Sequence, residues 1–297
     1  MKDTIKNKKE YDLIVIGAGS GGVRAARIAA NHGAKVAIIE SVRVGGTCVL
    51  RGCVPKKLLV YGAHIAHDLE DAAGFGWNIG SIEHDWAKLI HSKDKELDRL
   101  NNIYLNLLSK VDIINGFGKI ISNNEVQING NIFKANKILI AVGGRPFLPK
   151  IHGIDLCINS DQALDLKKLP KKIIINGGGY IALEFAAIFA SLGSDVTLIY
   201  RGKNLLRGFD YDISRLIKDE YIKSNIKVLT ETKIISISKT KDSLSVTLNN
   251  NKNIVSNEVM FATGRVPNTK GLGLGDIGVQ TGLVGEIIVD KNNQTNI

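Results

Sequence analysis

The chain has 297 residues, 44 % of them hydrophobic and 23 % charged, a composition typical of a folded protein of about two domains. A disordered or fibrous protein is excluded. No run reaches the ~20 apolar residues of a membrane span, and the first apolar run begins too early to follow a signal peptide, so we expect a cytoplasmic protein without membrane contacts. The net charge of +10 lies on scattered, mostly lysine side chains without interleaved aromatic residues, which disfavours nucleic acid as a partner.

A βαβ unit is predicted near the start of the chain. Strand patterns over residues 11–17 and 34–40 flank an alanine-rich helical pattern over 23–31. Between the first strand and the helix lies the glycine-rich turn Gly17-Ala18-Gly19-Ser20-Gly21-Gly22.

Three of the four glycines of this turn match a dinucleotide-binding fingerprint. Gly17 permits the tight turn, Gly19 lets the backbone approach a pyrophosphate, and Gly22 allows the helix to pack closely on the strand. The helix N-terminus faces the anion with free N–H groups. Glu40, at the end of the second strand, is placed to accept a hydrogen bond from a ribose hydroxyl.

Residues 45–57, GGTCVLRGCVPKK, form the most specific stretch of the chain. Cys48 and Cys53 are separated by four residues, a spacing that does not match a zinc site, so no metal is expected. The pair fits a redox-active disulfide, and Pro55 suits the first turn of a helix whose N-terminus lowers the pKa of a nearby thiol. The alternative is a pair of small buried residues. Cys157 is expected to be an inert thiol of the core.

The middle of the chain predicts a helix over residues 93–108 and strands over 111–114, 125–128 and 137–142. We interpret these strands as a β-meander attached to the first unit. The strand over 137–142 leads into the turn Gly143-Gly144-Arg145-Pro146.

A second βαβ unit is predicted about 160 residues after the first. Strands over 172–176 and 195–200 flank an apolar helix over 182–192, and the turn between them reads Gly177-Gly178-Gly179-Tyr180-Ile181-Ala182. The strands that follow, over 227–229, 234–238, 243–248 and 259–264, end in Gly264-Arg265-Val266-Pro267. The similar ending in both halves indicates two related domains.

The second unit differs from the first at the position that selects the nucleotide. Tyr200, followed by Arg201, stands 23 residues after Gly177, at the spacing where the first unit has Glu40. Arg201 and Arg207 can pair with a 2′-phosphate through their planar donor forks. We therefore expect NADPH rather than NADH; the alternative is that both arginines are ordinary surface cations.

Taken together, these motifs resemble those of the FAD-dependent pyridine-nucleotide disulfide oxidoreductases, and among them the glutathione-disulfide reductases most closely. The resemblance covers the whole chain and rests on residues 17–22, 45–57, 177–184 and 262–269. It implies an α/β fold with two Rossmann-like dinucleotide-binding domains, each with a β-meander. The implied domains are an FAD-binding domain with the redox disulfide at 1–147, an NADPH-binding domain at 148–267, and the start of a returning central domain at 268–297.

The same resemblance implies the site residues. For FAD they are Gly17, Gly19, Ser20, Gly21, Gly22, Glu40, Thr47, Cys48, Lys56 and Gly118. For NADPH they are Gly178, Ile181, Glu184, Arg201, Arg207 and Gly264, with Tyr180 as an aromatic gate. Glu184 is implied as the partner of Lys56, with Lys57 as the alternative. For glutathione disulfide the residues are Ser20, Arg27 and Tyr104.

The implied reaction is the NADPH-dependent reduction of glutathione disulfide to glutathione. Electrons pass from NADPH through the flavin to the Cys48–Cys53 disulfide. Cys53 becomes the thiolate beside the flavin, and Cys48 becomes the outer thiolate that attacks the substrate. Arg24 and Arg27 share a helix face whose positive charge suits an anionic disulfide.

The sequence departs from this family at its C-terminal end. A dimerisation domain with an acid–base histidine is expected after residue 297, and the histidines present all precede the second glycine turn: His32, His64, His67, His84, His91 and His152. We therefore expect a C-terminally truncated chain that lacks turnover and the homodimer of the full-length family. A non-catalytic nucleotide-binding remnant, an NADPH diaphorase and another disulfide reductase of the family stay open. Dihydrolipoamide dehydrogenase and mercuric reductase are disfavoured, because both favour serine at the position of Lys56.

Overall fold

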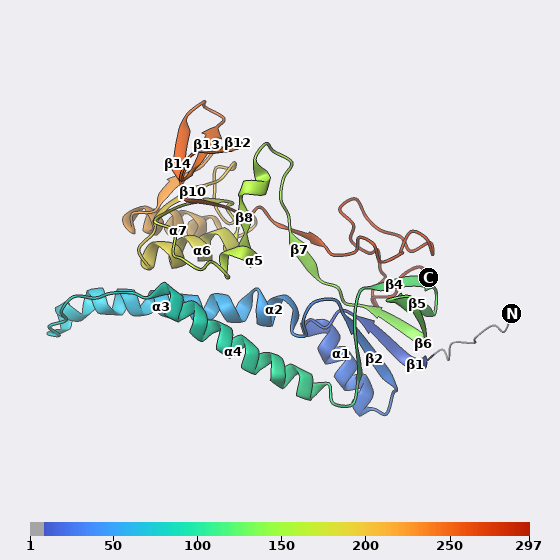
Figure 1. The fold of residues 1–297 in the computed structure, drawn as a ribbon. Coiled ribbons are helices and arrows are strands. Elements are labelled where there is room, and N and C mark those ends of the chain that lie inside the picture. Colours follow the sequence, from blue (N-terminus) through green and yellow to red (C-terminus); the bar gives the residue numbers. More distant parts are fainter. Residues whose placement is uncertain (1–8) are drawn as a thin grey trace. The chain divides into compact units, whose positions relative to one another are not determined.

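The computed structural model describes residues 9–297, which divide into two compact units, each described by itself below (Figure 1). Unit 1 comprises the described part of Met1–Val54 together with Glu96–Arg145 and Val266–Ile297. Unit 2 comprises Pro55–Lys95 and Pro146–Arg265. The chain therefore passes between the units several times, and residues 55–95 belong to unit 2.

Unit 1 is built on a mixed sheet of six strands in the order β3-β2-β1-β6-β5-β4. The pairs that join β3, β2, β1 and β6 are parallel, whereas β4, β5 and β6 form an antiparallel meander. The strands are β1 (Lys9–Ile16), β2 (Val36–Glu40), β3 (Asp112–Asn115), β4 (Gly118–Ser122), β5 (Glu125–Ile128) and β6 (Asn131–Ile140).

The parallel part of this sheet is covered by helix α1 (Ser20–Asn31). Val23 and Ala26 of α1 are buried against Val15 and Ile38 of the sheet. The four residues of β2 before Glu40 are buried and apolar, as expected for a parallel strand inside an α/β layer. Because these strands are short and run parallel, their carboxyl ends meet at one edge, where β1 leads into the glycine turn.

Unit 2 contains a parallel sheet of five strands in the order β11-β10-β9-β15-β8. Its strands are β8 (Ile158–Asn159), β9 (Lys172–Asn176), β10 (Asp195–Ile199), β11 (Lys227–Leu229) and β15 (Glu258–Phe261). A separate antiparallel meander is formed by β12 (Ile234–Lys239), β13 (Leu244–Leu248) and β14 (Asn253–Ser256). Two short strands, β7 (Gly144–Pro146) and β16 (Arg265–Pro267), pair with each other.

The remaining helices complete the two units. Two of them run across a unit boundary, α3 (Cys53–Asp71) and α4 (Trp86–Leu107). The others are α2 (Gly46–Leu50), α5 (Ser160–Ala163), α6 (Tyr180–Ser191) and α7 (Tyr211–Lys223), with short 3₁₀ turns at Ala72–Phe75 and Ile154–Leu156.

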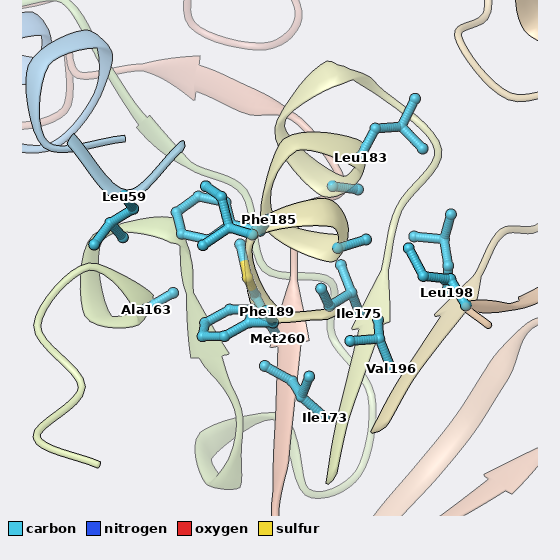
Figure 2. Close-up of a cluster of buried hydrophobic side chains, with 14 of the residues drawn as sticks. Leu59, Ala163, Ile173, Ile175, Leu183, Phe185, Phe189, Val196, Leu198 and Met260 are labelled. Carbon is cyan, nitrogen blue, oxygen red and sulfur yellow. The ribbon is translucent and has the colours of Figure 1, made fainter. Parts of the chain in front are cut away.

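The core of unit 2 lies around α6 (Figure 2). Phe185 and Phe189 stack with their ring centroids 6.0 Å apart, and Trp86 approaches Phe189 at 5.9 Å. Leu59 of α3 belongs to the same buried cluster. The indole N–H of Trp86 donates to the Leu166 carbonyl at 2.7 Å, which fixes the start of α4 against this unit.

A fully buried lysine of α4 forms a further contact within unit 2. The ammonium group of Lys93 lies 2.6 Å from Asp94 and 3.4 Å from Asp165. A buried charge is tolerated only where it is paired, and these two carboxylates supply the pairing. The sequence periodicity does not indicate this contact, because Asp165 lies far along the chain.

The predicted α/β fold class is confirmed, with one repeated arrangement and two differences in detail. Each unit combines Rossmann-like parallel strands with a three-stranded antiparallel meander, which belongs to the same sheet in unit 1 and forms a separate sheet in unit 2. The strand expected over 111–114 does not join the meander; as β3 it pairs in parallel with β2, and the third meander strand is β4. The helix expected over 93–108 starts earlier, at Trp86, where the Asp85 carboxylate accepts the Lys88 N–H at 3.0 Å. Within residues 9–297, no helix has the length and apolar character needed to cross a membrane.

We expect Phe189→Ala to lower the free energy of unfolding by about 3–5 kcal/mol, because it removes a fully buried ring. Phe75→Ala is the matched control, because its side chain is 83 % exposed and its loss should change stability by less than about 0.5 kcal/mol. Urea denaturation followed by circular dichroism measures both. Equal shifts for the two variants would contradict this description of the core.

Candidate functional site

The turn between β1 and α1 depends on backbone contacts that leave no room for a Cβ atom. Gly17 has φ +104°, and a Cβ there would collide with the carbonyl of Ala141, which follows β6. A Cβ on Gly22 would collide with the carbonyl of Gly17. The first N–H groups of α1 have no intrahelical acceptor, and no side chain caps this end of the helix. The turn can therefore present several N–H donors to one anion.

Glu40 fastens the end of β2 to this turn. One carboxylate oxygen accepts the Ala18 N–H at 2.8 Å, and the other accepts the Val42 N–H at 2.9 Å. Each carboxylate oxygen can accept more than one hydrogen bond, so Glu40 can still receive a hydroxyl donor. The side chain is half-buried, which leaves access for such a group.

A pocket opens beside Glu40 at the carboxyl edge of the sheet. It brings together Gly17, Glu40 and Gly118, three of the residues that the sequence implied for one ligand. It also contains Phe117, which is half-exposed and which the sequence analysis missed, because a single aromatic residue between two glycines carries no spacing signal. The full lining is Ile16, Gly17, Ile39, Glu40, Ser41, Gly116, Phe117, Gly118, Val142, Asn268 and Leu272.

Helix α2, which carries Thr47 and Cys48, is held against the same turn. The Gly45 N–H donates to the Ala18 carbonyl at 2.8 Å. Gly46 lies so close to Gly19 that a Cβ on Gly46 would collide with the Gly19 Cα atom. The glycines that begin the cysteine stretch therefore allow it to approach the dinucleotide turn, a contact that their sequence positions alone do not reveal.

Cys48 and Cys53 are free thiols, one on α2 and the other at the start of α3, and Cys53 acts on the pKa of Cys48 through the interaction between them. The hydrogen bond with Cys53 and partial burial raise the pKa of Cys48, while a hydrogen bond with the Ser20 hydroxyl lowers it. Cys53, at the first position of α3, is exposed. Two interacting thiols of this kind can form a disulfide with each other or resolve a mixed disulfide.

In unit 2 the second glycine turn repeats the geometry of the first. The Gly177 N–H donates to Ile199 at 2.9 Å, and a Cβ on Gly177 would collide with the Ala262 carbonyl. The corresponding contacts in unit 1 are Gly17 with Ile39, at 2.8 Å, and with Ala141. The two sheets thus build the same turn from sequences that share little beyond glycine.

The loop after β10 lies on the second turn. The Leu206 N–H donates to the Gly178 carbonyl at 2.7 Å, and the Tyr200 ring covers Gly178, where a Cβ would collide with it. Arg201 and Arg207 on this loop are exposed, and neither forms an ion pair with any residue that the structure describes. Ile181 is half-buried at the start of α6, and Gly264, with φ +126°, is exposed.

An ion pair in unit 2 links α3 to α6. The Lys56 ammonium donates to the Glu184 carboxylate at 2.7 Å, with both side chains partly exposed. Lys57 instead lies over the Tyr61 ring, with Nζ 5.5 Å from its centroid. Lys56, and not Lys57, is therefore the partner of Glu184.

Tyr221 lies next to this ion pair and was not indicated by any sequence motif. Its hydroxyl donates to the Leu183 carbonyl at 2.7 Å. Burial and then the charge of Glu184 raise the pKa of Tyr221 to about 12, so it stays a neutral donor. Tyr180, at the first position of α6, is 56 % exposed.

Two further predicted residues of unit 1 share the surroundings of α1. Arg27 is half-buried on α1, and Arg24, one turn earlier, is exposed. Tyr104 of α4 packs against the buried cluster that contains Val23 and Ala26 of α1. Both arginines therefore lie on the helix that begins at Ser20, and Tyr104 packs near its buried side.

Comparison with known proteins identifies the family. A family model described as pyridine nucleotide-disulphide oxidoreductase matches residues 11–297. The chain belongs to this family. This confirms the family inferred from the motifs.

The similar members of the pyridine nucleotide-disulphide oxidoreductase family include reductases of bacteria and plants. The chain is 47 % identical to a glutathione reductase of Burkholderia cepacia, over 97 % of this chain and 65 % of that protein. It is 47 % identical to the chloroplastic/mitochondrial glutathione reductase of Pisum sativum, over 97 % of this chain and 55 % of that protein. The HOCl-induced flavoprotein disulfide reductase RclA of Escherichia coli superposes with a TM-score of 0.87 at 29 % identity, covering 96 % of this chain and 64 % of RclA. The chain thus spans 55–65 % of the length of these proteins.

The three cysteines should differ sharply in reactivity. Burial raises the pKa of Cys157 to about 12, with smaller contributions from Glu258 and Asp155, so at pH 8 this thiol stays neutral and unreactive. We expect iodoacetamide to modify the exposed Cys53 in the folded protein and to modify Cys157 only after unfolding in urea. Peptide mass spectrometry gives the extent of labelling at each cysteine. Equal labelling of Cys157 and Cys53 in the folded protein would contradict the burial of Cys157.

Proposed function

We propose that this chain binds FAD and NADPH and reduces glutathione disulfide through Cys48 and Cys53. The observation that carries the proposal is the pair of free thiols at α2 and the start of α3, on a stretch whose glycines pack against a dinucleotide-binding turn. Residues 1–147 and 148–267 are proposed as the FAD-binding and NADPH-binding domains, and 268–297 as the start of the returning central domain. When bound, FAD accepts two electrons from the nicotinamide and passes them to a disulfide.

The residues of unit 1 fit FAD. The backbone donors of the first turn, at Gly19, Ser20, Gly21 and Gly22, suit the pyrophosphate. Glu40 suits the ribose, and the pocket that continues to Gly118 suits the adenine end. Thr47 and Cys48 of α2 are proposed for the flavin end.

The residues of unit 2 fit NADPH. The second turn presents its own N–H groups beside Gly178 and Ile181, and Glu184 and Gly264 are proposed as further contacts. Arg201 and Arg207 have no ion pair within the described residues and lie on the loop bound to Gly178, so both are available for the 2′-phosphate.

The two thiols perform the disulfide chemistry in two balanced steps. The Cys48 thiolate attacks one sulfur of glutathione disulfide, forming a Cys48–glutathione mixed disulfide and releasing one glutathione thiolate. The Cys53 thiolate then attacks the Cys48 sulfur, forming the Cys48–Cys53 disulfide and releasing the second glutathione thiolate. Each released thiolate takes up one of the two protons that the cysteine thiols gave up.

The charge around α1 supports an anionic substrate. Arg27 and Arg24 are one helical turn apart and supply positive charge, and Tyr104 offers an aromatic wall beside the same helix. Ser20 begins that helix and contacts Cys48. Glutathione disulfide carries carboxylates that these cations attract.

A single-turnover experiment tests the thiol chemistry with this chain alone. The protein is reduced, freed of reductant without oxygen and mixed with glutathione disulfide. We expect two molecules of glutathione per chain and a Cys48–Cys53 disulfide, both found by mass spectrometry. Cys53→Ser should stop at the mixed disulfide on Cys48 with one glutathione released. If Cys48→Ser releases as much glutathione as the unchanged protein, the proposed function is wrong.

We expect Arg201→Ala and Arg207→Ala each to weaken NADPH binding about tenfold and to leave NADH binding unchanged, because only NADPH carries the 2′-phosphate. Isothermal titration calorimetry at fixed salt measures both nucleotides. Arg215→Ala is the matched control, because this exposed arginine lies near Asp212 on α7, at 3.8 Å, and should change neither affinity. Equal weakening of NADPH and NADH would contradict the 2′-phosphate assignment.

A further inference from the structure

The Tyr200 ring lies between two glycines of unit 2. Tyr200 follows the last residue of β10, and its half-buried side chain packs against the core of the unit. A Cβ on Gly178 would lie 2.5 Å from the Cγ and Cδ2 atoms of the ring, and a Cβ on Gly202 would lie 2.7 Å from its Cε1 atom. The near end of the ring therefore rests on the glycine turn, and its far end rests on the loop after β10.

The backbone on both sides of Arg201 is held by hydrogen bonds. Before it, the Tyr200 carbonyl accepts the Thr232 N–H at 3.1 Å. After it, the Gly202 carbonyl accepts the Glu231 N–H at 3.0 Å. Arg201 therefore lies between two fixed residues, and the ring of the first also contacts the glycine turn.

Gly178 is the point of the turn to which this loop is attached twice. The Tyr200 ring packs on it, and its carbonyl accepts the Leu206 N–H at 2.7 Å. Arg201 is the next residue after the first contact, and Arg207 is the next residue after the second. Each arginine thus comes directly after a residue that contacts the turn.

Unit 1 has a side chain with the same attachment and a different chemistry. Glu40 and Tyr200 stand at the same spacing after the first glycine of their own turns. The Glu40 carboxylate accepts the N–H of Ala18, which like Gly178 is the second residue of its turn. In unit 2 a ring replaces this carboxylate. The turn is still held, without a negative charge that would repel an anion there.

We propose that Tyr200 is a positioning residue for the 2′-phosphate of NADPH, in which its ring holds the loop of Arg201 and Arg207 against the glycine turn. Donors that are already oriented bind a phosphate at a lower cost in entropy. The absence of a side chain at Gly202 then has a function, because it leaves room for the ring. This inference rests on the proposed function, which assigns the two arginines to that phosphate.

The test measures the affinities of the full chain for NADPH and NADH by isothermal titration calorimetry at fixed salt. We expect Tyr200→Ala to weaken NADPH binding about tenfold and NADH binding less than about twofold, because only the 2′-phosphate needs the arginines. Tyr200→Phe keeps the ring and should retain the affinity for NADPH. The matched control is Tyr211→Ala, because this tyrosine at the start of α7 is 60 % exposed and should change neither affinity.

A second substitution tests the contact itself. Gly202 is not one of the glycines with positive φ, and the three atoms nearest to an added Cβ all belong to the Tyr200 ring. We expect Gly202→Ala to weaken NADPH binding about tenfold in the unchanged protein and to have no further effect in Tyr200→Ala, a coupling that a double-mutant cycle measures. Gly74→Ala is the control, because its methyl group enters open space. Circular dichroism verifies folding, and if Tyr200→Ala does not fold, Gly202→Ala decides.

Amide hydrogen exchange without nucleotide shows whether the ring holds the loop. The Leu206 N–H, which is bound to Gly178, should exchange about tenfold faster in Tyr200→Ala than in Tyr200→Phe, as followed by mass spectrometry of peptides that contain it.

The outcomes separate this inference from the proposed function. If Arg201→Ala and Arg207→Ala weaken NADPH binding but Tyr200→Ala does not, the inference is overturned and the function stands. Equal weakening of NADPH and NADH by Tyr200→Ala, or unchanged exchange at Leu206, also overturns it. If neither arginine variant changes the affinity for NADPH, the proposed 2′-phosphate site is wrong, and the inference falls with it.

Discussion

Both nucleotide turns depend on one constraint, the contact of backbone with backbone at positions where a Cβ atom does not fit. Gly17 meets the carbonyl of Ala141, and Gly177 meets that of Ala262, each at the residue that follows the neighbouring strand. A side chain at either glycine would push the turn away from its sheet and move the N-terminus of the helix that follows, where the proposed anion would bind. In unit 1 the same constraint extends to Gly46 against Gly19, which brings α2 and its cysteine to the turn. The proposed thiol chemistry and the proposed nucleotide binding in this unit therefore depend on the same backbone contacts.

Further hydrogen bonds hold the glycine turn of unit 1 and the loop after β10 of unit 2 in place. Glu40 binds the turn through the Ala18 N–H, so a residue proposed for the ribose also holds the glycine loop in place before any ligand arrives. In unit 2 the loop of Arg201 and Arg207 is fixed by the hydrogen bond between Leu206 and Gly178. In each unit a ligand group would thus meet donors that are already oriented, which lowers the entropy cost of binding.

The sequence predicts the features that are encoded locally. Short windows of sequence show the glycine turns, the first strand and helix of each unit, and the cysteine pair. They also show that Glu40 and Tyr200 stand at the same spacing after the first glycine of their own turns. Pairing of β3 with β2 is not visible, because a short apolar strand carries no information about which edge it joins. The contacts of Lys93 with Asp165 and of Tyr221 with Leu183 link distant segments, so no periodicity indicates them.

The central claim is that the two nucleotide sites and the cysteine pair belong to one working electron path. Anaerobic titration of the FAD-reconstituted protein with NADPH tests it most directly, with the visible spectrum recorded after each addition. We expect a long-wavelength charge-transfer band that appears far more readily with NADPH than with NADH and that is lost in Cys53→Ser. Failure to bind FAD, or flavin reduction without a band that depends on Cys53, would contradict it.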